Sequence, residues 1–553
     1  MQTAQPGFFA RRLPTFYGWV GNFGWPILLK QLRVEFRRNR FLYCHFASLA
    51  LLAGWLLTIV STEATNLNVK PTQVGQSIFN SFLNIQTCIV VFLFPLFGAT
   101  SFTQERANLS LDFLTTSTLS AEEIVWGKFL ASGLYCLLYV AATVPLLAIS
   151  FLFGGVTVSD VLVAYGGLIS ATVLISMLAI CVSSWFKSSV GALITTYSLM
   201  LLAAVVIWFV YIVPVDAALA DDPNQTTISA LKSQFGLKAE NRWIFDTVRL
   251  FDALAIFFFL FLVAANRVRP AADDHASKFR ILALVYFPLR IVGGFYQAFG
   301  DHVISNDLMS SEQIDAEMSW LAVFGGIALL VQALVFSTEE ADLSNRNRSQ
   351  FVSWRGIRYP FRVFSPGAFW GSVYALGLTV LCCALLGGLF HFHLADVADE
   401  ATILWVNEVV LTLPIYVAGF VALGFLLSVS AFTPLYSRLT VSFIFIITVL
   451  LPKIFHISLS PDSVYNLYYL SPWVLWSSLE YIQAPPELDE VQYRLFGFHQ
   501  IDIAKVVFAG LFVLLGLVGL LVAKRSSLPL LRFVGRPQRA EPKTDQPAAA
   551  AAS

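Results

Sequence analysis

Long apolar runs dominate this sequence and decide what it can fold into. A helix that crosses a bilayer needs about 20 mostly apolar residues. Twelve runs meet this requirement, near residues 41–62, 78–102, 124–153, 160–184, 190–214, 249–266, 280–299, 319–337, 369–390, 403–430, 439–457 and 503–523. Only 13% of the residues are charged, against about 25% in soluble proteins. The sequence therefore predicts an all-α polytopic membrane protein with about 12 transmembrane helices.

Lysine and arginine gather in alternate loops between these runs. They concentrate before Phe41, at 267–280, at 346–362 and after Val522, whereas the loops around 301–317 and 396–400 are acidic. Because basic loops are retained in the cytoplasm, we expect both termini to be cytoplasmic and the chain to lie in the cytoplasmic (inner) membrane. The first apolar run follows a long basic segment, so we expect no cleavable signal peptide.

The twelve runs form two groups of six around a basic linker. Residues 102–110 (FTQERANLS) match residues 336–344 (FSTEEADLS) at five of nine positions, at the end of the second run in each group. Trp126-Gly127 likewise matches Trp370-Gly371. Two tandem six-helix halves are therefore predicted. The expected division is a basic amphipathic segment at 1–40, a first half at 41–266, a linker at 267–280, a second half at 281–523 and a disordered tail at 524–553.

The segment before the first run has the pattern of a basic amphipathic helix. Apolar residues recur at helical spacing from Trp25 to Phe36. The basic residues of the other face are Lys30, Arg33, Arg37 and Arg40. Such a helix lies in the membrane interface with its basic side chains at anionic headgroups. The alternative interpretation is a signal that only fixes the topology.

The loop after the second run carries two helix signals. Ser120 is a candidate N-cap and Glu123 completes a capping box, so a helix should begin at Ala121. The preceding segment 109–114 is predicted as a short helix with interleaved apolar and charged residues. It is too polar to enter lipid, and it offers a docking surface for a soluble partner.

This loop resembles that of the type-2 ABC exporter permeases. The similar residues are the Glu105-Arg106 pair, then 111–117 (LDFLTTS) and 119–129 (LSAEEIVWGKF). The resemblance covers about residues 25–266 and is weaker over 280–525, where Glu339-Glu340 replaces the pair. It implies cytoplasmic connecting and coupling helices, and contact with a cytosolic ATPase subunit in two copies. The coupling residues it implies are Glu105, Arg106, Leu109, Asp112, Leu114, Ser120, Glu122 and Glu123, with Glu339 and Glu340 in the second half.

Enzyme motifs are not found in the sequence. It contains no GxxxxGK[ST] loop and no HExxH, so ATP hydrolysis is expected in a partner protein. No catalytic, cofactor-binding or metal-ligating residue is predicted, no nucleic acid is expected, and His391 and His393 are interpreted as a solvated rim. The expected function is export of an apolar or amphipathic substrate by a fused pseudo-dimer in the lipid bilayer. An ion-gradient transporter, with Arg290 as its candidate buried charge, and a membrane scaffold are the alternatives.

Overall fold

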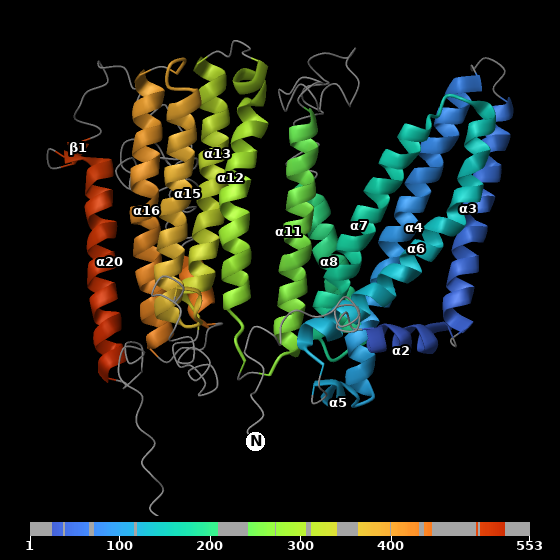
Figure 1. Cartoon of the computed structure of the whole chain (residues 1–553), viewed down its shortest axis with the longest axis horizontal. Helices are drawn as coiled ribbons and strands as arrows, with labels where there is room; N and C mark the ends of the chain where they lie inside the picture. Colours follow the sequence, from blue (N-terminus) through green and yellow to red (C-terminus); the bar gives the residue numbers. More distant parts are fainter. Residues whose placement is uncertain are drawn as a thin grey trace, which may run out of the picture. The chain divides into compact units, whose positions relative to one another are not determined.

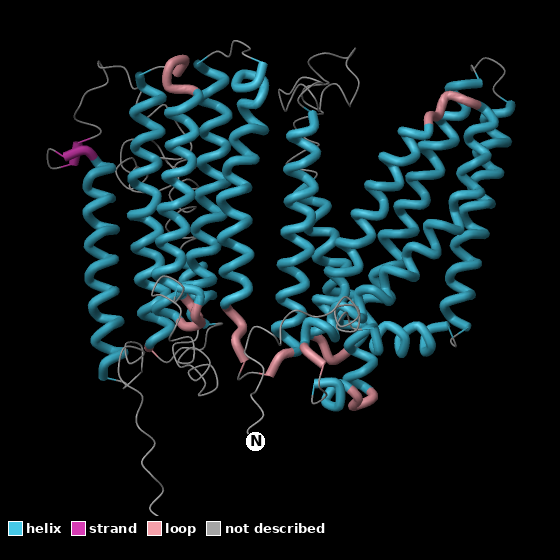
Figure 2. The backbone as a smooth tube through the Cα atoms, in the orientation of Figure 1, coloured by secondary structure: helices cyan, strands magenta, loops and turns pink. Residues whose placement is uncertain are grey.

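The computed structural model describes most of the chain as helices. The described residues are 25–36, 39–65, 71–115, 119–207, 242–270, 273–305, 311–339, 363–398, 400–430, 436–444, 494–495 and 498–525. They divide into two compact units, Met1–Ala271 and Ala272–Ser553. Figure 2 shows that helix accounts for nearly all of the described residues in both units, which confirms the predicted all-α class.

Eight of the described helices are long and apolar enough to cross a membrane. These spans are Tyr43–Thr62, Val74–Ala107, Ala121–Ala148, Asp160–Trp185, Thr247–Val268, Ser277–Gly300, Ala368–His393 and Thr402–Val429. Three shorter apolar helices, Ser189–Ala204, Gly325–Ser337 and Ala509–Val522, coincide with further predicted runs. Only the start of the predicted run at 439–457 lies within the described residues, so the count of 12 stays a prediction.

The first unit is a helix bundle with a crosswise helix at one end. Its helices are α2 (Trp25–Phe36), α3 (Asn39–Thr65), α4 (Pro71–Ala107), α5 (Leu111–Thr115), α6 (Ala121–Phe153), α7 (Val158–Trp185), α8 (Ser189–Ile207) and α11 (Arg242–Val268). The long helix α4 packs against α6, α7 and α8, and α11 packs against α6 and α7. Within this unit, α2 lies across the direction of the long helices and α5 lies beyond the end of α4 (Figure 1).

The second unit is built around α16. Its elements are α12 (Ser277–Ser305), α13 (Ser311–Ser337), α15 (Ala368–His393), α16 (Glu400–Val429), the paired strands β1 (Arg494–Leu495) and β2 (Phe498–His499), and α20 (Gln500–Arg525). Helices α13, α15 and α20 all pack on α16. Helix α12 continues through Arg290, so the run that contains this charge is helical along its whole length.

Small residues bring the long helices close together in both units. A Cβ at Gly98 of α4 would lie 2.6 Å from the Cβ of Ala179 in α7, and one at Gly371 of α15 would lie 2.0 Å from the carbonyl oxygen of Phe336 in α13. Close backbone approach at small residues is a main source of helix packing in membranes. These contacts hold the ends of α4 and α13 against their neighbours, and the polar residues described next lie at those ends.

Candidate functional site

The end of α4 is a tight turn that contains a leucine in a left-handed conformation. The Ser110 amide donates to the Glu105 carbonyl at 2.9 Å and the Leu109 amide to the Arg106 carbonyl at 3.1 Å, the bond pair of a Schellman motif. Leu109 has φ +53°, a region that usually belongs to glycine or asparagine in this motif. The predicted short helix therefore begins at Leu111, and not at Leu109, because Leu109 belongs to the turn.

Helix α5 has an inward and an outward face. Leu111 and Leu114 pack against the buried cluster that includes Phe102, Ile124 and Phe129 of α4 and α6. Leu109 and Phe113 instead expose 74% and 78% of their surface. These two exposed apolar side chains, at the end of the bundle, are a candidate contact surface.

The carboxylate of Glu105 lies between two lysines from two other helices. Lys128 Nζ of α6 is 2.8 Å from Glu105 Oε2, and Lys30 Nζ of α2 is 3.4 Å from Oε1. Lys128 also donates to the Ser101 carbonyl at 2.9 Å and lies 4.6 Å above the centre of the Phe102 ring. We call Glu105, Lys30 and Lys128 the Glu105 cluster. It joins the end of α4 to α2 and α6.

Arg106, the next residue, turns to the opposite side of α4. Its guanidinium donates to the carbonyl oxygens of Ser184 and, at 2.9 Å, Phe186. These carbonyls lie at the end of α7, where helical acceptors have no partner within the helix. The Phe102 amide donates to Ser183 Oγ at 3.0 Å, which adds a second bond between the same helix ends. The end of α4 is thereby tied to the α7–α8 turn.

The start of α6 carries the predicted capping box. Glu123 donates its amide to Ser120 Oγ at 3.2 Å, and Glu123 Oε2 accepts from the Ser120 amide at 2.9 Å. The helix begins at Ala121, so this prediction is confirmed. Glu122 faces away from the box and forms an ion pair with Arg269, which follows α11.

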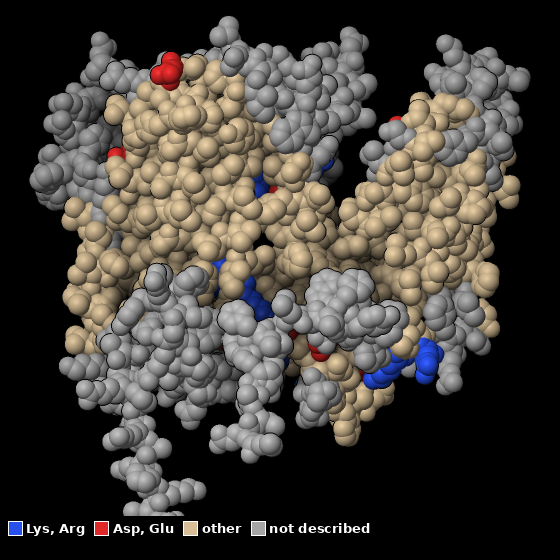
Figure 3. Space-filling model, in the orientation of Figure 1, with Lys and Arg blue, Asp and Glu red and all other residues tan. Residues whose placement is uncertain are grey.

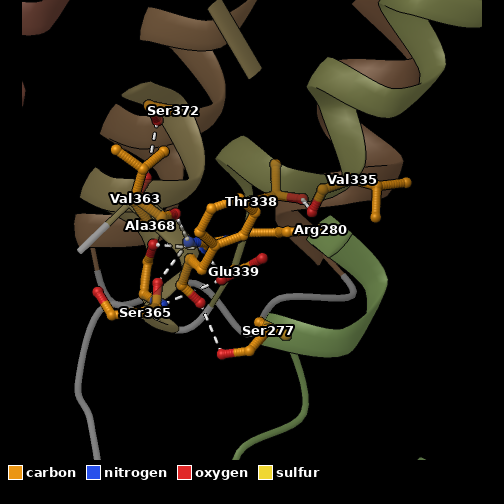
Figure 4. A network of polar contacts seen from close by, with 12 residues as sticks. Ser277, Arg280, Val335, Thr338, Glu339, Val363, Ser365, Ala368 and Ser372 are labelled. Carbon is orange, nitrogen blue, oxygen red and sulfur yellow. Dashed lines mark hydrogen bonds and ion pairs between the residues drawn. The ribbon is translucent and has the colours of Figure 1, made fainter. Parts of the chain in front are cut away.

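A second polar cluster surrounds Arg280 at the start of α12 (Figure 4). The fully buried guanidinium forms an ion pair with Glu339 and donates to the carbonyl oxygens of Val363, Ser365 and Gly367. Glu339 Oε2 also accepts from the Gly367 amide at 3.0 Å. Burial raises the pKa of the Glu339 carboxyl above its ordinary value, and Arg280 opposes part of this rise. We call these five residues the Arg280 cluster.

Glu105 and Glu339 are the glutamates that the nine-residue match aligns. Glu105 lies at the end of α4 and Glu339 just after the end of α13, and both form an ion pair with a fully buried cation. In the first unit the cation, Lys128, comes from α6, which follows α4, whereas in the second unit the cation, Arg280, comes from α12, which precedes α13. Ser183 of α7 accepts from the Phe102 amide near the end of α4, and Ser428 of α16 donates to the Glu339 carbonyl just after α13.

Other sequence-predicted residues are placed as follows. Lys30 and Arg33 are exposed on α2. Arg37 and Glu340, together with the side chains of Asp112 and Arg40, lie outside the described residues. His391 Nε2 is 2.7 Å from Asn407 Oδ1 and His393 Nε2 is 3.4 Å from the Tyr296 hydroxyl. Within the described ranges, no group of three His, Cys, Asp or Glu residues is arranged to hold a metal ion.

Lys128 and Arg280 are the important residues that sequence reasoning missed. Each lies at the edge of an apolar run, where a basic residue can signal a buried partner, although Arg280 has Lys278 two residues before it. That signal indicates neither the partner nor its position, because the paired glutamates are far away in the sequence.

Comparison with known protein families gives one match. Residues 53–232 match the family model described as ABC-2 family transporter protein. The matched range contains Glu105, Arg106, α5, the capping box and Lys128. No curated protein and no solved structure is significantly similar to the chain.

Proposed function

Because residues 53–232 match the family model described as ABC-2 family transporter protein, we propose that the chain is the membrane-spanning permease of an ATP-driven exporter. Its two fused six-helix halves form one membrane unit in the inner membrane, with both termini in the cytoplasm. Two copies of a separate cytosolic ATPase supply the energy, and the substrate is apolar or amphipathic.

The exposed side chains of Leu109, in the turn before α5, and Phe113 of α5 are the observation that carries this proposal. Leu109 holds an exposed apolar side chain in a backbone conformation that glycine adopts at lower cost. Strain of this kind persists where the side chain has a use that offsets it. Leu109 and Phe113 together form an apolar projection of the first unit, which suits insertion into a pocket on a soluble partner.

The bonds around the end of α4 provide a path from this surface into the bundle. Glu105 faces inward to Lys128, so it acts by fixing the helix end and not by touching the ATPase. Arg106 ties the same helix end to the α7–α8 turn. A displacement of α5 therefore reaches α4, α6 and α7 together, which a transporter that alternates between two arrangements requires.

The test is purification of the tagged chain from its own membranes, followed by native mass spectrometry. We expect a complex with two copies of a P-loop ATPase. Leu109→Gly preserves the turn and removes the side chain, and Phe113→Ser removes the second apolar contact. Both variants should insert normally and lose most of the bound ATPase.

Phe392→Ser is the matched control, because Phe392 is 83% exposed at the end of α15 and has no part in the proposed contact. It should retain the ATPase. A wild-type complex without any ATPase would contradict the permease proposal and favour a gradient-driven transporter or a scaffold. Full ATPase retention by Leu109→Gly and by Phe113→Ser would contradict the proposal that these two residues contact the ATPase.

A further inference from the structure

One face of helix α2 packs against the rest of the first unit, and another face is exposed. Ile27 and Leu28 are buried, Ile27 within the apolar cluster that contains Val125 and Phe129 of α6. The Tyr135 hydroxyl of α6 donates to the Gln31 carbonyl at 3.4 Å, which fixes the same face. α2 therefore has a set orientation on the bundle.

The outward face combines two basic residues with an apolar one. Leu29 is 40% exposed, the Lys30 side chain is 48% exposed, and Arg33 is exposed one turn further on. Figure 3 shows basic side chains gathered on α2, at the end of the unit where the helix lies crosswise. A crosswise helix with this composition has the geometry of an interfacial helix.

The charges in the Glu105 cluster do not balance. One carboxylate is shared by two ammonium groups, of which Lys128 is closer, at 2.8 Å, and fully buried. Lys30 is further away, at 3.4 Å, and half-exposed. Lys128 alone neutralises Glu105, so Lys30 contributes a positive charge beyond what the cluster needs. Arg33 adds a second positive charge beside it, because residues three apart are neighbours on a helix.

From these observations we infer that the outward face of α2 binds the headgroup of an anionic phospholipid. Lys30 and Arg33 contact the phosphate, and Leu29 enters the boundary between headgroups and acyl chains. The lipid competes with Glu105 for Lys30, so the lipid composition modulates the contact between α2 and the end of α4. The inference rests on the proposed membrane orientation of the first unit, but not on an ATPase partner.

The test measures lipid retention by the full chain without any ATPase. The protein is reconstituted in nanodiscs of phosphatidylcholine with an equal amount of phosphatidylglycerol, released into mild detergent, and its bound lipids are counted by native mass spectrometry. We expect wild type to retain phosphatidylglycerol at least about fivefold over phosphatidylcholine, since each basic residue near a membrane surface contributes about that factor. Arg33→Gln should lower this preference about fivefold, and Lys30→Gln with Arg33→Gln should abolish it.

Lys187→Gln is the control, because it removes one exposed positive charge from the α7–α8 turn of the same unit. It should leave the preference unchanged. The single variant Arg33→Gln tests lipid binding without disturbing the fold, because Arg33 is exposed and Lys30 keeps its contact with Glu105. Equal retention of the two lipids by wild type would overturn the inference, and so would an equal loss in the Lys187→Gln control. Displacement of the lipid by millimolar inorganic phosphate would also overturn it, in favour of a soluble anion.

Discussion

Lys128 Nζ lies 2.8 Å from Glu105 Oε2, with the lysine side chain fully buried and the glutamate side chain 10% exposed. The pair joins the end of α4 to α6 at the place where α5 leaves the bundle. Its two members have unequal surroundings. Glu105 has a second cation in Lys30, whereas Lys128 finds in Glu105 its only carboxylate among the described ion pairs.

This difference in surroundings predicts which of two single substitutions destabilises the chain more. Glu105→Gln leaves Lys128 charged and buried without its counter-ion, and breaking a buried pair in this way costs about 3–5 kcal/mol. Lys128→Met leaves Glu105 with Lys30 and some solvent, so it should cost less. Thermal unfolding of the purified chain in detergent, followed by tryptophan fluorescence, should therefore show the larger loss for Glu105→Gln.

The double variant Glu105→Gln/Lys128→Met provides the control for the same pair. Its stability should exceed that of Glu105→Gln alone, because no uncompensated charge remains. If Lys128→Met proved the more harmful single change, the assigned surroundings of the two residues would be wrong.

The capping box at the start of α6 predicts a second pair of variants. Ser120→Ala removes the oxygen that accepts from the Glu123 amide, and loss of an N-cap costs about 1 kcal/mol. Glu123→Gln keeps an acceptor for the Ser120 amide, and glutamine also occurs at this position of capping boxes. Thermal unfolding should show a drop for Ser120→Ala and little change for Glu123→Gln. If Glu123→Gln lowered the melting temperature as much as Ser120→Ala, the charge of Glu123 would contribute to stability beyond the hydrogen bond that glutamine keeps.

Two glycines of α15 should respond to alanine with opposite signs. A Cβ at Gly371 would lie 2.0 Å from the Phe336 carbonyl oxygen, whereas one at Gly377 would meet nothing within 4 Å. Gly371→Ala must push α13 and α15 apart, and overpacking of this kind costs about 1–3 kcal/mol. Gly377→Ala should be neutral or raise the melting temperature, because alanine favours the helix over glycine. A neutral Gly371→Ala would show that the two helices are not in close contact.

The local features of the site were predictable because they depend on neighbouring residues. The Ser120–Glu123 capping box and the start of α6 follow from four consecutive residues, and the short helix before them follows from its periodicity. The one local error, at Leu109, arose because its left-handed conformation contradicts the preference of leucine. Sequence periodicity cannot indicate that a residue will adopt a conformation that is unfavourable for its type.

The ion pairs could not be predicted, because they join residues distant in the sequence. Glu105 and Glu339 were named as coupling residues through the family resemblance, and their pairing with Lys128 and Arg280 depends on how the helices pack. The apolar surface of a membrane helix gives little guidance here, since lipid and protein neighbours attract the same side chains. The nine-residue match aligns the two glutamates but not their cations, which come from α6 and α12.

Arg280 allows a prediction that depends on the shape of the guanidinium. Its two terminal nitrogens reach Glu339 and three carbonyl oxygens at once, which the single ammonium of lysine cannot do. Arg280→Lys should therefore lower the melting temperature of the chain although it keeps the charge, and lost hydrogen bonds to buried groups cost about 1–3 kcal/mol each. Protease digestion should also cut the variant faster.

Lys278→Gln serves as the control for Arg280→Lys, because Lys278 is exposed two residues earlier in the same helix. A surface substitution of this kind changes stability by about 0.5 kcal/mol or less, so its melting temperature should match that of wild type. If Arg280→Lys behaved like Lys278→Gln, charge alone would hold Glu339 in place. The bonds to the Val363, Ser365 and Gly367 carbonyls would then contribute little to the position of the segment that precedes α15.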